Sequence, residues 1–94
     1  MPSVRTNDLE RALQRKGFEG KVRGGHVYYF LIADGKHTGL HAHRSLRDLE
    51  LHSGRLGQMA RELRLSRDEF MEVVDCTRDH DGLIALLRSK GVTI

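Results

Sequence analysis

The chain has 94 residues, a formal net charge of +3 and an apolar content of 38%. This length predicts a single domain with a thin core, because small domains bury a modest share of the surface that their unfolded chains expose. The sequence has no apolar run near the ~20 residues that a membrane span needs and no apolar stretch typical of a secretion signal near its start, so we expect neither a membrane protein nor a secreted one.

Cys76 is the one cysteine in the sequence, so an intramolecular disulfide cannot form. This cysteine usage predicts a reducing, cytoplasmic setting without membrane contact. The apolar run before Cys76 favours a buried structural thiol. Asp75 and Asp79 flank it, whereas a catalytic thiolate needs basic neighbours.

Positive charge is concentrated in the first half of the chain. Residues 1–45 carry eight Lys or Arg against four Asp or Glu, whereas residues 46–94 carry eight against nine. The same basic half holds four of the six histidines. An uneven basic balance of this kind favours a polyanionic partner such as nucleic acid.

The first predicted element is a helix over residues 8–16. Asn7 is expected to be its N-cap, and Glu10, three residues later, completes a capping box. Gly17 is a natural C-terminal stop for this helix. The segment FEGKVR, residues 18–23, then predicts a short strand.

A β-hairpin is predicted next. Gly24-Gly25 breaks the first strand, and residues 26–33 are rich in β-branched and aromatic side chains, which favour a second strand. Asp34-Gly35 follows as a two-residue turn, because both central positions of a type I′ turn require a positive φ. The returning strand is predicted over residues 36–43.

The rest of the chain is predicted to be mainly helical. Residues 44–52 indicate an irregular connection, and Ser53 is expected to cap a second helix. Ser66 and Glu69 form an S-x-x-E capping box for a third helix. Asp79 or Asp81 caps a fourth helix, which Gly91 ends.

The element order α-β-β-β-α, followed by two more helices, predicts an α+β fold. In this fold a three-stranded antiparallel sheet has one face covered by helices. We expect residues 1–65 to form an RNA-binding and RNA-cleaving domain. Residues 66–94 form a helical extension that either packs on the same domain or pairs with a second copy of the chain in a homodimer.

The hairpin register predicts which side chains share a face, because directly opposite residues lie on the same face. A two-residue turn at 34–35 pairs Tyr29 with Leu40, so these residues belong to the core side. It pairs His26 with His43, Tyr28 with His41 and Ile32 with His37 on the other side. The predicted core is Leu9, Leu13, Tyr29, Leu31, Leu40, Leu56, Met59 and Leu63. The predicted outer face carries His26, Tyr28, Phe30, His37, His41 and His43.

Three interpretations of the outer face compete. It could be a solvated sheet face, but exposed Tyr28 and Phe30 argue against this because an open apolar patch usually has a partner. It could be a metal site built on His41 and His43, with His26 as a third ligand. The sequence nearby offers no carboxylate or thiolate to complete a strong metal signature, so we predict no metal and no cofactor.

The third interpretation is binding or cleavage of nucleic acid. Tyr28 and Phe30 offer stacking surfaces for unpaired bases. Imidazole groups, whose ordinary pKa is near 6.5, can move protons at neutral pH. The cations expected around the edge of the face, as contacts for phosphates, are Lys21, Arg23, Lys36 and Arg44.

The chain resembles the HicA toxins of bacterial and archaeal toxin–antitoxin systems over about residues 8–66. The resemblance lies in the order of short motifs: the helix LERALQRKGFE, the loop RGGH, the aromatic strand, the DG turn, a strand ending in histidine, and SGRLGQMARELRLS. Gly25 stands where the family usually has serine, and Val27 stands where a second histidine is frequent. The tail after Ser66 is longer than in the short members.

The resemblance implies a double-stranded-RNA-binding-domain-like core and activity as an mRNA interferase, an endoribonuclease that inhibits translation. It also implies a HicB-type antitoxin as partner, and it places the family's catalytic histidine on His26. RNA cleavage needs no metal if a base such as neutral His26 activates the 2′-OH. The proton donor to the leaving group is His43 or His41, and nearby cations such as Lys21, Arg23 or Lys36 stabilise the developing charge.

A second function stays open beside this one. A non-catalytic module for binding RNA or protein could have the same fold, because fold alone does not decide function.

Overall fold

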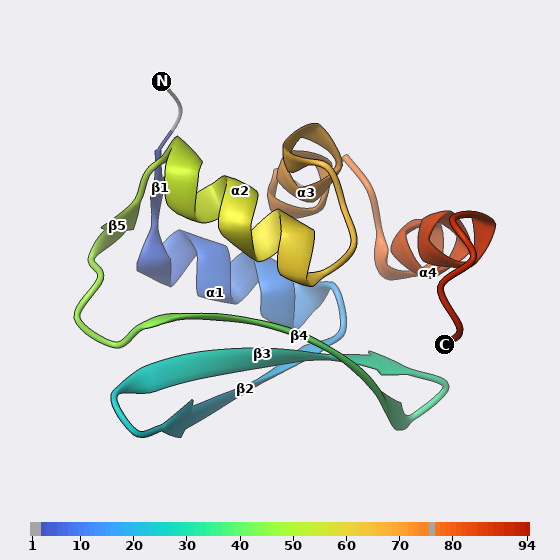
Figure 1. Cartoon of the computed structure of the whole chain (residues 1–94), viewed down its shortest axis with the longest axis horizontal. Helices are drawn as coiled ribbons and strands as arrows, with labels where there is room; N and C mark the ends of the chain where they lie inside the picture. Colours follow the sequence, from blue (N-terminus) through green and yellow to red (C-terminus); the bar gives the residue numbers. More distant parts are fainter. Residues whose placement is uncertain (1–2, 76) are drawn as a thin grey trace.

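The computed structural model describes residues 3–75 and 77–94 and shows the expected α+β architecture (Figure 1). The central sheet is antiparallel, in the order β2 (Phe18–Arg23), β3 (His26–Ala33) and β4 (Lys36–Ser45). Helices α1 (Thr6–Arg15), α2 (Ser53–Glu62) and α3 (Arg67–Val74) lie on one side of it, and α4 (His80–Ser89) lies beside its end. The expectation of a buried thiol at Cys76 falls outside the described residues.

A small second sheet was not expected from the sequence. Strands β1 (Val4–Arg5) and β5 (Glu50–Leu51) pair antiparallel and bring residues near the N-terminus against the segment before α2. Two-residue strands carry no detectable alternation, so periodicity could not reveal them. The segment 44–52, predicted as irregular, therefore contains the end of β4 and all of β5.

The capping predictions have mixed outcomes. The Ser66–Glu69 capping box is present at α3, and the Asp79 side chain accepts from the Gly82 backbone at the start of α4. The prediction for Asn7 is wrong, because α1 begins at Thr6 with Arg5 at the N-cap and no side-chain cap bond. The Thr6 backbone N–H donates to Leu49 O at 3.1 Å, so a contact with a distant segment replaces the local cap.

The turn between β3 and β4 is as predicted, with φ of 53° at Asp34 and 75° at Gly35. The register beyond it is not. After the expected pair Ile32–His37, strand β4 gains two residues in a bulge, and Phe30 pairs with His41. Gly39, with φ of 85°, lies inside the bulge.

The Thr38 hydroxyl satisfies backbone groups at this bulge. It donates to Leu31 O at 3.0 Å and accepts from the Leu40 N–H at 3.2 Å. The expected pairs Tyr29–Leu40, His26–His43 and Tyr28–His41 are therefore wrong, each displaced by two residues along β4. Because two residues are one full period of a strand, the histidines of β4 keep their predicted face.

The core lies between the sheet and the helices. The predicted core residues are buried, except that Leu40 is half-buried beside the bulge. The same buried cluster includes residues of α3 and α4, namely Phe70, Val73, Leu83, Ile84 and Leu87. No helix within the described residues is long and apolar enough to cross a membrane. The functional division at residue 65 stays a prediction.

Candidate nucleic-acid interface

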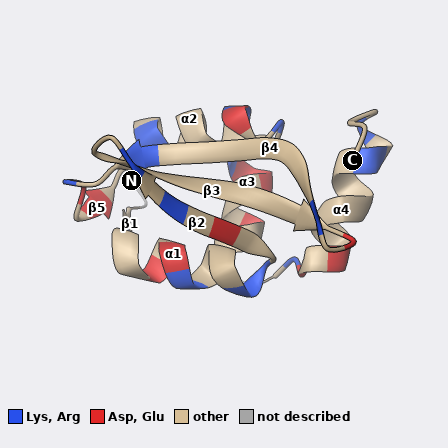
Figure 2. Cartoon of the chain, turned by 90° about the horizontal axis from the view of Figure 1, so that it is seen from below, with Lys and Arg blue, Asp and Glu red and all other residues tan. Residues whose placement is uncertain are grey.

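The sheet face turned away from the helices carries the rows of side chains that the sequence predicted to lie there. Figure 2 shows this face with no described helix across it, and with both basic and acidic segments along β2. We call it the open face. Its rows across β2, β3 and β4 are Glu19–Phe30–His41, Lys21–Tyr28–His43 and Arg23–His26–Ser45, with His37 opposite Ile32 toward the hairpin turn.

Aromatic and imidazole rings form a continuous surface on this face. Tyr28 and Phe30 have centroids 6.2 Å apart with nearly parallel planes. Tyr28 lies 5.6 Å from His43 and 6.2 Å from His26, and those two histidines lie 5.6 Å from each other. Phe30 extends the surface, because its centroid lies 5.3 Å from that of His41.

Two imidazoles of this surface, those of His26 and His41, are anchored through the same ring nitrogen. His26 Nδ1 lies 3.3 Å from Gly24 O, and His41 Nδ1 lies 3.2 Å from Gly39 O. A carbonyl oxygen can only accept, so each Nδ1 carries the proton in these contacts. In the neutral ring this leaves Nε2 as an acceptor, the state that a general base requires.

His43 has a different anchor, which the sequence did not indicate. Its Nδ1 lies 2.7 Å from Glu62 Oε2, and the two form an ion pair when the ring is protonated. Its backbone N–H donates to Glu62 Oε1 at 3.3 Å. Glu62 is the last residue of α2 and lies 19 positions from His43, so no local motif could have associated the two residues.

The four candidate phosphate contacts do not share one location. Lys21 and Arg23 lie on the open face, opposite Tyr28 and His26. Lys36 is exposed at the hairpin turn, where it pairs with buried Ala33. Because paired residues share a face, Lys36 belongs to the face of the sheet that the helices cover.

The placement of Arg44 at the edge of the open face is wrong. Arg44 is buried on the helix side of the sheet, where its Nε donates to Tyr29 OH at 2.9 Å. The same hydroxyl donates to Glu10 Oε1 at 3.4 Å. Burial is the main cause that raises the pKa of Tyr29, and the neighbouring Arg44 opposes the rise. Arg44 follows Ala42 on the core side because strand residues two apart share a face.

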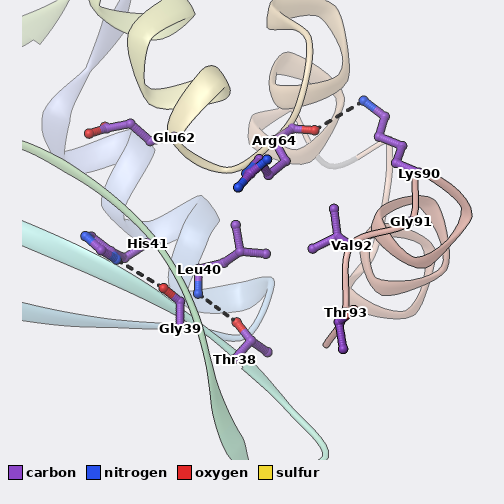
Figure 3. A pocket seen from close by; sticks show the side chains of 10 residues that line it. All are labelled: Thr38, Gly39, Leu40, His41, Glu62, Arg64, Lys90, Gly91, Val92 and Thr93. Carbon is purple, nitrogen blue, oxygen red and sulfur yellow. Dashed lines mark hydrogen bonds between the residues drawn. The ribbon is translucent and has the colours of Figure 1, made fainter.

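A groove adjoins the open face beyond the outer edge of β4. It has a volume of about 560 Å³ and lies between the β4 bulge, the end of α2 and the C-terminal segment (Figure 3). His41 and Glu62 line it, so it is continuous with the open face. Arg64 lines it too, and its backbone oxygen accepts from Lys90 Nζ at 3.3 Å.

A metal site at His41 and His43, with His26 as a third ligand, would need these side chains arranged around one ion. Within residues 3–75 and 77–94, no group of three or more His, Cys, Asp or Glu side chains is arranged to hold a metal ion. His52 and His80 lie away from the open face. His52 is exposed at the N-cap of α2. His80 is the first residue of α4, and its Nε2 lies 2.7 Å from Ile32 O.

Comparison with known proteins gives no match: no protein-family model, no curated protein and no solved structure matches this chain. The resemblance to HicA toxins therefore stays a prediction that rests on the motifs of the sequence.

Proposed function

We propose that the open face binds an unpaired segment of mRNA and cleaves it without a metal, as a HicA-type endoribonuclease. The observation that carries this proposal is the pair formed by His26 and His43. Their ring centroids lie 5.6 Å apart on a surface of stacked rings, with Arg23 directly opposite His26. Two imidazoles this close can serve the 2′-OH and the 5′-oxygen of one phosphodiester.

Binding is supported by the ring surface and the cations of β2. Each unpaired base that stacks on Tyr28 or Phe30 gains about 1–3 kcal/mol, and such stacking tolerates many sequences. Lys21 and Arg23 border these rings and are exposed, so they can contact the phosphates that follow the bases. The face therefore suits single-stranded RNA whose bases are turned toward the sheet.

The proposed cleavage uses the substrate's own 2′-OH. Nε2 of neutral His26 takes the 2′ proton, the 2′-oxygen forms a bond to phosphorus, and the bond from phosphorus to O5′ breaks. O5′ keeps the electron pair and takes a proton from a second histidine, His43 or His41. The products are a 2′,3′-cyclic phosphate and a 5′-OH, and Arg23 and Lys21 stabilise the charge of the transition state.

The cellular setting of this proposal follows the family resemblance. A HicB-type antitoxin would neutralise the enzyme, translation would stop when it is free, and both proteins would act in the cytoplasm. The reaction requires no cofactor. Pairing of two copies into a homodimer remains compatible with the proposal.

The decisive experiment is cleavage of a single-stranded RNA by purified protein in excess chelator. Wild type should release cyclic-phosphate ends, and a substrate with 2′-deoxyribose at the cleavage position should be inert. His26→Ala should lower the rate about 100-fold or more, the scale for loss of a general base. His37→Ala is the matched control, because His37 is also exposed on this face but lies toward the hairpin turn, opposite Ile32.

The alternative function is binding without cleavage. Stacking on Tyr28 and Phe30 requires no proton transfer, so the ring surface would serve a non-catalytic RNA-binding module equally well. Salt-sensitive RNA binding with no cleavage by wild type would favour that module. Cleavage that chelator abolishes and zinc restores would favour a metal site at His41 and His43.

A further inference from the structure

We infer that Glu62 is a positioning residue for His43, and that His43 rather than His41 protonates the leaving O5′. This inference rests on the proposed cleavage reaction. It names the acid that the sequence left open, and it adds a residue that no motif indicated.

Glu62 holds His43 at two points. One carboxylate oxygen accepts from the His43 backbone N–H at 3.3 Å, and the other lies 2.7 Å from Nδ1 of the ring. The side chains of His43 and Glu62 are 30% and 25% exposed, so both are partly shielded from water. The carboxylate therefore fixes the ring relative to its own strand, at the outer edge of β4.

The other histidines of the open face lack such a partner in the described structure. His26 and His41 contact carbonyl oxygens two residues earlier in the chain, which carry no net charge. His37 has a carboxylate near it, but Glu19 lies 3.8 Å away, beyond hydrogen-bond distance, and faces Nε2 rather than Nδ1.

These contacts divide the roles of His26 and His43. A general acid must hold protons on both ring nitrogens before it donates one, so its Nδ1–H needs an acceptor in both states. Glu62 provides a charged acceptor at Nδ1 of His43, and this leaves Nε2–H for the RNA. The base needs an unprotonated Nε2 instead, which the carbonyl contact of His26 provides. The centroid distance of 5.6 Å places this acid beside this base.

Glu62→Gln tests the inference with little change of shape. The amide oxygen can still accept from the His43 backbone, but the amide NH₂ then donates to Nδ1 and excludes a proton there. The doubly protonated ring is lost, and kcat should fall about 100-fold or more, the scale of general acid catalysis. KM should stay nearly unchanged, because Lys21, Arg23 and the rings that bind RNA are untouched.

Two further variants separate positioning from general damage. Asp81→Asn is the matched control, because it also removes a carboxylate near Nδ1 of a histidine, 3.9 Å from His80 and away from the open face, and it should leave kcat unchanged. His41→Ala should raise KM through the lost ring surface rather than lower kcat. Glu62→Gln should melt at the same temperature as wild type.

A spectroscopic readout gives a second test that does not depend on turnover. The ¹⁵N shifts of neutral His43 should show the proton on Nδ1 in wild type and on Nε2 in Glu62→Gln. If wild type cleaves RNA, an unchanged tautomer or an unchanged kcat in Glu62→Gln would overturn the role of Glu62 alone. A wild type that does not cleave RNA would overturn the proposed function and this inference together.

Discussion

Gly17 joins three elements, and its replacement by alanine gives the sharpest test of how the tail is attached. The residue follows α1 with φ of +83°, and a Cβ there would lie 2.4 Å from His80 Cδ2 and 2.7 Å from Nε2. His80 Nε2 in turn lies 2.7 Å from Ile32 O, so this ring connects α4 to the end of β3. Gly17→Ala must therefore displace the His80 ring.

The expected cost has two parts. An L-residue at this φ costs about 1–2 kcal/mol, and losing the hydrogen bond from His80 to Ile32 O costs about 1 kcal/mol more. The sum, about 2–3 kcal/mol, should lower the melting temperature of a domain of this size by roughly 10–20 °C. Gly91→Ala is the matched control: Gly91 also follows a helix, has φ of +84°, and has nothing within 4 Å of a built Cβ. It should show the backbone cost alone.

The assay is urea unfolding of the two variants, His80→Ala, and the double variant Gly17→Ala/His80→Ala. Without the imidazole ring the new methyl group meets no obstacle, so the double variant should be more stable than the sum of the single effects by about 1 kcal/mol. Strict additivity, or equal losses for Gly17→Ala and Gly91→Ala, would refute the attachment through His80.

Three further predictions concern stability and binding. The hydrogen bond from Lys90 and the backbone N–H of Ser66 hold the pKa of Glu69 below its usual value of 4.5. This contribution to stability is therefore present above pH 4.5 and lost as the pH falls. In Glu69→Gln the free energy of unfolding, measured against pH in acid, should change less steeply than in wild type. Phe70→Ala should cost about 3–5 kcal/mol by urea unfolding, because Phe70 is fully buried in the shared core; a soluble variant of unchanged stability would show that α3 is an independent appendage. Lys21→Ala should reduce by about 1 the slope of the logarithm of RNA affinity against the logarithm of salt concentration. Arg44→Met should lower stability without changing that slope, because Arg44 is buried on the helix side of the sheet.

Several features of this protein could be predicted from local sequence because they depend on neighbouring residues alone. Asp34-Gly35 adopts the positive φ values that a tight hairpin requires. Ser66 and Glu69 satisfy each other's backbone groups within a single helical turn. Alternation along β3 and β4 assigned His26, His41 and His43 to one face. That assignment survived the error in register, because the bulge added an even number of residues.

Tertiary structure decided the features that join distant segments. The bulge at Thr38 shifts every pair beyond it, and it brings Tyr28 opposite His43. The sequence carries no periodic signal for a contact between the end of α2 and the edge of β4, so Glu62 could not be found from a motif. Arg44 was expected at the edge of the open face as a phosphate contact, because the strand was predicted to end at residue 43, whereas β4 continues to Ser45 and its alternation turns Arg44 to the helix side. Its burial is tolerated because the Tyr29 hydroxyl, on an adjacent strand, accepts from its guanidinium.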